Sequence, residues 1–180
     1  MTSIIQTVNY NAIDVKDLRF EGYSKIFSLG NYTTTLNVGE NVERLPSWLS
    51  SYAREWINSG SVIGSGFKYA AFNKVNFKGN RLKTMGRDCF LFCKLEEIEF
   101  PEGLEDIGEQ TFENCSELKK VYIPSSVNKF SSSVLADCIS NCKIYCENTE
   151  EVKSKSGWDT NWNNKKTVVY GVSREEYKNM

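Results

Sequence analysis

The sequence predicts an α/β repeat fold: a right-handed solenoid of short parallel strands that is capped at both ends. Three observations predict it. Apolar residues recur every 23 positions between residues 72 and 146, proline follows two of the expected strands, and both ends of the chain depart from the repeat. A chain of 180 residues is long enough for one domain with its own core.

Three consecutive segments share one order of apolar residues. The copies are Phe72, Val75, Phe77, Leu82, Met85, Phe90 and Cys93; then Leu95, Ile98, Phe100, Leu104, Ile107, Phe112 and Cys115; then Leu118, Val121, Ile123, Val127, Phe130, Leu135 and Cys138. The fifth apolar position is followed by Gly86, Gly108 and Ser131 in turn. One such coil cannot close its own core, so stacked coils must bury it together. A period of this length with an L-x-x-L-x-L start is typical of a leucine-rich repeat.

Each coil is expected to contain a strand and a return segment. The first apolar positions predict a short strand that stacks in parallel on its neighbours about 4.8 Å away. Pro101 and Pro124 end two of these strands because proline has no N–H to donate. The stretch "GEQTFENC" predicts a helical or 3₁₀ return turn that points Phe112 and Cys115 inward. Weaker coils flank the three copies, at Leu36, Val38, Val42 and Leu45 before them and at Ile144 and Cys146 after them.

The stretch "LEEIEFPEGLEDIGEQTFENC" resembles the BspA-type leucine-rich repeat, and "IYCENTEEVKSKSGWDTNWN" resembles the way such arrays end. The resemblance covers roughly residues 33–171. It implies a leucine-rich-repeat solenoid of the kind found on bacterial and protozoan surfaces and in some phages. It also implies a binding protein, since members so described mostly bind other proteins and some are adhesins.

The ends of the chain are predicted to cap the solenoid, because an open stack exposes apolar faces. Residues 1–32 are an N-terminal cap with strands in "IIQTV" and "KIFSL", residues 33–171 are the solenoid, and residues 172–180 are a tail. Within the C-terminal cap, 147–171, Trp158 and Trp162 are four residues apart and would share one face of a helical turn over Ile144. The alternative for the two tryptophans is stacking on a sugar or another ligand.

Residues 47–71 break the period and form an insertion. Ser47 is expected to cap a helix that runs to about Ile57. Its apolar stripe would consist of Trp48, Leu49, Tyr52 and Trp56. The stretch "SGSVIGSG" predicts a loop, since its glycines do not complete a phosphate-binding motif. Because the insertion departs from the repeat, it is also a candidate contact surface.

All six cysteines lie in the second half of the chain. Cys93, Cys115 and Cys138 share one repeat phase and are expected to form an inward ladder of small apolar residues. Reduced structural thiols are favoured, while disulfides between stacked neighbours stay open as the alternative, because stacked coils fall within disulfide reach. The spacing predicts no metal site.

The third and fifth residues of each strand are expected to point outward on the concave sheet. The candidate binding residues on this face are Lys74, Asn76, Glu97, Glu99, Lys120, Tyr122, Lys143 and Tyr145. Glu97 is predicted to pair with Lys74 and Lys120, which would neutralise the face. Tyr122 and Tyr145 are the predicted main contacts, because tyrosine offers a large area at low entropy cost. The alternative is that the two rings only stack on each other.

Composition narrows the classes of function. The net charge of −1 predicts no nucleic-acid partner, and no apolar run approaches the roughly 20 residues that span a membrane. The chain has no histidine, so the commonest general base and metal ligand are missing, and we predict no enzyme and no cofactor. An enzyme would need a cleft with perturbed carboxylates, whereas the acidic residues of the middle repeat are predicted to form a solvated face.

The leading hypothesis is therefore a non-enzymatic protein-binding module that uses the concave face, the 47–71 insertion or both. The alternative is a structural or receptor-binding component of a phage particle or an adhesin-like cell-surface assembly, for which self-association is expected. The N-terminus does not resemble a signal peptide. This predicts a cytoplasmic or virion-associated chain, and a trimmed export signal would instead place it at the cell surface.

Overall fold

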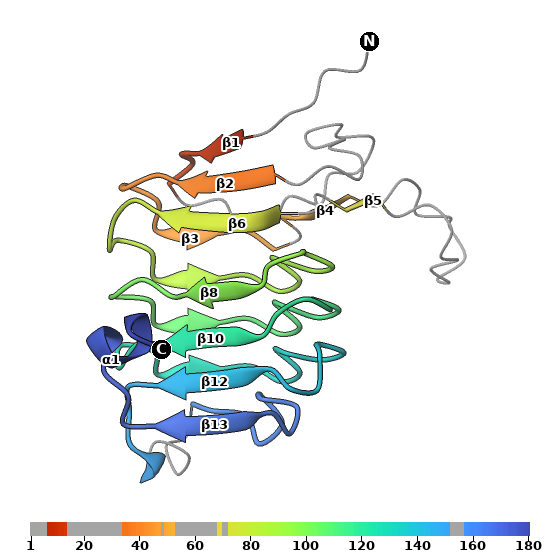
Figure 1. The fold of residues 1–180 in the computed structure, drawn as a ribbon. Helices are drawn as coiled ribbons and strands as arrows, with labels where there is room; N and C mark the ends of the chain where they lie inside the picture. The colour runs from red at the N-terminus through yellow and green to blue at the C-terminus, as the bar shows by residue number, and fades with distance from the viewer. Residues whose placement is uncertain (1–6, 14–33, 48, 53–67, 70–71, 152–156) are drawn as a thin grey trace.

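The strands stack along one axis in a parallel solenoid. The computed structural model describes residues 7–13, 34–47, 49–52, 68–69, 72–151 and 157–180, and Figure 1 shows the stack in the order β1, β2, β6, β8, β10, β12 and β13. These strands span Thr7–Tyr10, Thr34–Val38, Phe72–Phe77, Glu97–Glu99, Lys120–Ile123, Lys143–Cys146 and Thr167–Tyr170. They form two parallel sheets, β1-β2-β6 and β8-β10-β12-β13, which we call together the strand face. The predicted parallel solenoid is therefore confirmed, while its handedness and caps remain predictions.

A third parallel sheet runs along another side of the stack. It consists of β3 (Arg44–Leu45), β7 (Thr84–Met85), β9 (Asp106–Ile107) and β11 (Lys129–Phe130). Each of these short strands ends on the fifth apolar position of its coil, and these residues are buried. An isolated parallel bridge from Phe130 to Trp158 continues the ladder into the last coil. The fifth apolar position therefore marks a strand as well as a core residue.

The return segments form a third backbone ladder. The amide of Phe90 donates to the carbonyl of Thr111 at 2.8 Å, and the amide of Phe112 donates to Val134 at 2.9 Å. Parallel bonds flank them, from Phe92 to Glu113 at 3.0 Å and from Asn114 to Ala136 at 2.9 Å. Neighbouring coils are thus hydrogen-bonded on three sides over most of the stack, while the strand face divides into two sheets between β6 and β8. These bonds satisfy polar backbone groups that the stack would otherwise bury unpaired.

The return segments are turns rather than helices, so the α part of the predicted α/β class is not confirmed. Positive φ values between 52° and 58° recur at two equivalent positions, in Asp88, Gln110 and Ser133 and in Phe92, Asn114 and Asp137. A left-handed residue interrupts α-helical hydrogen bonding and turns its peptide groups toward the neighbouring coil. In the described part of the chain, α-helix occurs in α1 (Arg174–Lys178), outside the repeats.

The recurring apolar residues form one continuous core. The rings of Phe90 and Phe112 stack with centroids 5.3 Å apart, and Phe100 lies 5.6 Å from Phe112. Leu135 is buried in the next coil, and the amide bonds of the return ladder align the three positions as one column. Val75 and Phe77 are only partly buried. Apart from these two, the residues that the period of 23 places inward are buried.

The predicted helix of the insertion is wrong where the structure describes it. Ser51–Tyr52 is a strand, β4, that pairs antiparallel with β5 (Lys68–Tyr69). The strand partners of Ser51 and Tyr52 lie 16 or more residues further along the chain. A local pattern of apolar residues does not show pairing over such a distance. The rest of the predicted helix lies mostly outside the described residues, as do Trp48, Trp56 and the glycine-containing loop.

Both ends add strands to the stack. β1 pairs in parallel with β2, with Val8 opposite Leu36, so the last residues of "IIQTV" are in a strand, while "KIFSL" lies outside the described residues. At the other end, β13 pairs with β12 and places Val168 opposite Ile144. Trp158 forms the bridge to Phe130 and Trp162 lies in a turn, and each ring is 4.6 Å from the ring of Phe130.

Candidate functional site

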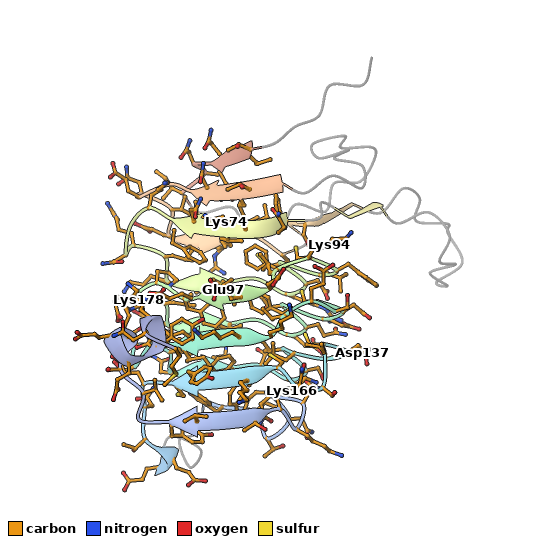
Figure 2. All side chains as sticks on the ribbon, in the orientation of Figure 1. Lys74, Lys94, Glu97, Asp137, Lys166 and Lys178 are labelled. Atoms are coloured by element: carbon orange, nitrogen blue, oxygen red, sulfur yellow. The ribbon has the colours of Figure 1, made fainter. Side chains whose placement is uncertain are left out.

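The predicted binding residues share one surface of the strand face. The register aligns Glu97 with Lys120 and Lys143 in one column, and Glu99 with Tyr122 and Tyr145 in the next. Lys74 and Asn76 continue the two columns on β6, and Figure 2 shows Lys74 and Glu97 on adjacent strands of the same side. Stacked parallel strands place equivalent residues in columns along the stack, as the sequence predicts.

An asparagine ladder orders the N-terminal part of this surface. The Asn37 Nδ2 donates to the Asn9 Oδ1 at 2.9 Å, and the Asn76 Nδ2 donates to the Asn37 Oδ1 at 2.9 Å. Asn9 was not among the predicted residues, although its place in β1 could have been found once Val8 and Tyr10 were taken as inward positions. The ladder holds the side chain of Asn76 in a defined rotamer beside the next strand.

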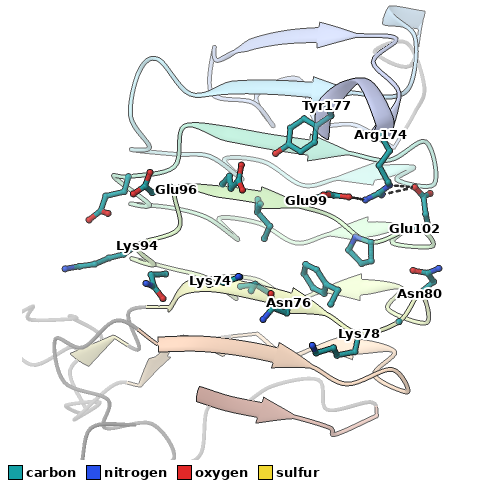
Figure 3. A pocket seen from close by; sticks show the side chains of 18 residues that line it. Lys74, Asn76, Lys78, Asn80, Lys94, Glu96, Glu99, Glu102, Arg174 and Tyr177 are labelled. Atoms are coloured by element: carbon teal, nitrogen blue, oxygen red, sulfur yellow. Dashed lines mark hydrogen bonds and ion pairs between the residues drawn. The ribbon is translucent and has the colours of Figure 1, made fainter. Parts of the chain in front are cut away.

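A groove of about 1210 Å³ lies over β6 and β8 and is bounded by α1 (Figure 3). Four predicted residues line it: Lys74, Asn76, Glu97 and Glu99. Its lining includes charged side chains of both signs from β6, from β8 and from the segments next to them, with Arg174 at the α1 boundary. The lysines are Lys74, Lys78 and Lys94, and the carboxylates belong to Glu96, Glu97, Glu99, Glu102 and Glu117. The groove therefore presents charges of both signs.

The C-terminal helix covers the other part of the predicted surface. The Tyr177 ring lies 5.0 Å from that of Tyr122 and 5.5 Å from that of Tyr145. Tyr122 is 0% exposed as a result. The expectation that Tyr122 is an accessible contact is wrong for this conformation, because residues 172–180 fold back instead of extending as a tail.

Arg174 ties α1 to β8 and to the loop after it. Its Nε donates to the Glu102 Oε1 at 2.8 Å, its Nη2 donates to the Phe100 carbonyl at 2.8 Å, and its Nη1 donates to Glu99. The guanidinium also lies 4.7 Å from the centre of the Tyr122 ring. Burial lowers the pKa of Arg174, but the two carboxylates outweigh burial, so its pKa is raised overall. The charge on Arg174 is thus matched by partners fixed on the sheet.

Lys120 contacts α1 rather than Glu97. Its Nζ donates to the Tyr177 carbonyl at 3.1 Å and lies 4.0 Å from the centre of the Tyr177 ring. Within the described residues no ion pair joins Glu97 to Lys74 or to Lys120, so the predicted neutralisation by these pairs is wrong. Lys143 is exposed beside Lys120 in the same column.

Arg174 and Tyr177 were missed because residues 172–180 follow the last apolar repeat position. A signal for them exists in "SREE", which is a capping-box sequence. The Glu176 amide donates to the Ser173 Oγ at 3.3 Å, and the Ser173 amide donates to the Glu176 Oε2 at 2.8 Å. This box starts α1 and sets Arg174 and Tyr177 three residues apart, on one side of the helix.

The cysteines are part of the core. All six are buried and none forms a disulfide, and the thiols of Cys115 and Cys138 donate to the carbonyls of Phe90 and Phe112 at 3.1 and 3.0 Å. Burial raises the pKa of Cys93 to about 12 and that of Cys146 to about 11. Neither thiol forms the nucleophilic thiolate near neutral pH.

The described residues contain neither a candidate metal cluster nor a membrane-spanning helix. No group of three or more cysteine or acidic side chains there could hold a metal ion. No helix in that part of the chain is long and apolar enough to cross a membrane.

Comparison with known proteins agrees with the repeat and the solenoid. The family model described as the BspA type leucine rich repeat region matches residues 61–164 in six copies, which is more than half of the chain. No curated protein and no solved structure matches the chain. A family of this kind suggests a protein-binding repeat module. The period, the stacked parallel strands and this match together show that the chain belongs to the BspA-type leucine-rich repeat family.

Proposed function

We propose that the chain is a non-enzymatic module that binds a segment of a protein partner in the groove over β6 and β8. The observation that supports this most is the groove itself, about 1210 Å³ in volume and lined by four residues of the predicted surface. Lys74 and Glu97 in it are exposed, so their charges are available to a partner. The paired strands fix the backbone positions of these residues, so no loop has to be ordered on binding.

The charges of the groove indicate the kind of segment that fits. Lys74 on β6 and Glu97 on β8 give the groove exposed charges of both signs, so a purely acidic or purely basic ligand would meet repulsion from one of them. A segment with both signs of charge can complement both. Such complementarity contributes more to specificity and association rate than to affinity.

Affinity capture from an extract of the native source tests this proposal. The bait is the immobilised chain in three forms: wild type, Lys74→Ala and Lys129→Ala. Lys129 lies on β11, away from the strand face, where it pairs with Asp106 at 2.7 Å, so it controls for the loss of one positive charge away from the groove. We expect a protein that wild type and Lys129→Ala capture equally and that Lys74→Ala captures at least tenfold less, at an unchanged melting temperature.

Glu97→Ala is the second groove variant, and it should lose the same protein. If Lys74→Ala and Glu97→Ala both capture the protein as well as the wild-type chain does, the binding surface lies elsewhere. The 47–71 insertion is then the next candidate.

A structural or receptor-binding part of a phage particle or adhesin-like surface assembly is the second candidate function. The observation that favours it is β13, which ends its four-stranded sheet and carries Val169 with 38% exposure. An unpaired strand edge can add a strand of another chain. The identity of the captured protein separates the two functions, since a particle component or a second copy of the chain would favour assembly.

A further inference from the structure

The surface under α1 has the properties of a second recognition site, occupied by the chain itself. We propose that β8, β10 and β12 form a site for a short helical turn that carries an arginine and an aromatic residue three positions apart, and that α1 is its internal occupant. A partner with the same pair of residues then competes with α1 for the strand face. This rests on the proposed function, because it assigns partner chemistry to the same protein-binding face.

The contacts of α1 are those of a bound ligand rather than of a repeat. α1 lies outside the coil series and comprises five residues, and isolated helices shorter than about 12 residues are marginal in water. Its Glu175 and Glu176 are exposed, and Lys178 adds one half-exposed ion pair with Glu99 at 3.5 Å, so the buried part of its docking surface is formed mainly by Arg174 and Tyr177. These two side chains reach three successive strands of the sheet.

The site recognises arginine by geometry as well as by charge. Glu99, Glu102 and the Phe100 carbonyl accept from three different nitrogens of the guanidinium, and the Tyr122 ring lies 4.7 Å from its carbon. A lysine offers one compact ammonium group and cannot satisfy these acceptors together. The arginine position is therefore the selective one.

The aromatic position is selective for a flat ring. The Tyr177 ring packs on Tyr122 and Tyr145 and receives Lys120 at 4.0 Å from its centre. Tyr177 is 3% exposed, whereas its hydroxyl has no hydrogen-bond partner in the part of the chain that the structure describes. The site thus selects the ring more than the hydroxyl. Lys120 adds one backbone contact by donating to the Tyr177 carbonyl.

Competition with α1 follows from its attachment. α1 is joined to β13 by Gly171, Val172 and Ser173, with Gly171 in the left-handed region at φ 72°. A short tether of this kind gives an effective concentration on the order of millimolar. A partner segment that binds the free site weakly is therefore excluded until it is abundant or makes further contacts in the neighbouring groove.

A synthetic peptide of residues 172–180, "VSREEYKNM", tests the proposal without any partner protein. Its binding is measured by calorimetry to the wild-type chain, to the double variant Arg174→Ala/Tyr177→Ala and to Lys129→Ala. We expect binding to the double variant to be at least tenfold tighter than to the other two, because only there is the site vacant. A peptide in which alanine replaces both the arginine and the tyrosine should lose this binding.

Two outcomes would overturn the proposal: no binding to a double variant that keeps its circular dichroism spectrum, or equal binding to all three chains. If the double variant unfolds, hydrogen exchange of the α1 amides in the wild-type chain decides the question. Saturating peptide should accelerate that exchange, and unchanged exchange would overturn the proposal. A negative result with the peptide does not contradict the proposed binding in the groove, because that proposal is tested separately with Lys74→Ala and Glu97→Ala.

Discussion

Gly108 lies where the backbones of two stacked coils approach each other closely. A Cβ at this position would be 2.7 Å from the amide nitrogen of Arg87 and 2.7 Å from the carbonyl carbon of Gly86. Gly86 is under the same restriction, because its Cβ would lie 2.3 Å from the Ser47 amide nitrogen. The recurrence of glycine after the fifth apolar position therefore reflects contact between stacked backbones.

We expect Gly108→Ala to lower the free energy of unfolding by about 1–3 kcal/mol, as overpacking of a close-packed interior does. Urea unfolding followed by circular dichroism measures it. The matched control is Ser131→Ala, because Ser131 holds the same repeat position and already carries a Cβ, and its effect should stay within about 0.5 kcal/mol. Equal stability of wild type and Gly108→Ala would show that the coils can separate at this point.

The C-terminal helix is the element whose docking depends most on single side chains. Tyr122 and Tyr177 form its aromatic contact, and burial raises the pKa of both hydroxyls, with Glu147 adding to the shift of Tyr122 and Glu97 to that of Tyr177. A raised pKa means that the docked form holds its protons more tightly than the released form. Docking is therefore fully stabilised below the ordinary tyrosine pKa of 10.0 and weakens as the pH rises above it.

We expect α1 to be released progressively above about pH 10, before the repeats unfold. Hydrogen exchange of the α1 amides, corrected for intrinsic rates, and tyrosine absorbance at 295 nm report release and ionisation respectively. The control is Tyr177→Phe, which keeps the ring packing and removes one of the two ionisations, so its release should depend less on pH. Identical pH dependence of wild type and Tyr177→Phe would contradict the assignment.

The whole molecule is held together by contacts between neighbouring coils. Phe112 is at the centre, stacked on Phe90 and in contact with Phe100, and it is fully buried. Ion pairs between coils add little, since pairs such as Lys83 with Glu105 are half exposed on both sides. Burial of the apolar column is thus the main source of stability.

Phe112→Ala is expected to cost about 3–5 kcal/mol of unfolding free energy, because it leaves a cavity on the shared faces of adjacent coils. Val169→Ala in the last strand is the comparison, and it should cost less than about 1 kcal/mol since Val169 is 38% exposed. Chemical denaturation measures both. Similar costs at the two sites would mean that the coils are not coupled through the central column.

About half of the candidate binding residues that the repeat predicted line the groove. Lys74, Asn76, Glu97 and Glu99 were predicted and line the groove, since register alone decides which strand residues point outward. Tyr122, Tyr145 and Lys120 were placed on the correct face, yet they contact α1. Their cover could not be predicted, because Arg174 and Glu99 are 75 positions apart and no periodicity connects them.

The sequence by itself determined the stack, its register and its buried residues. A repeated apolar pattern predicts these features because every coil buries the same positions against a neighbour of the same shape. The tertiary structure alone decided the turn conformation of the return segments, the strand pairing of β4 with β5 and the docking of α1. Each of these three features depends on contacts with another coil or with a distant part of the chain. Local sequence propensity therefore does not predict them.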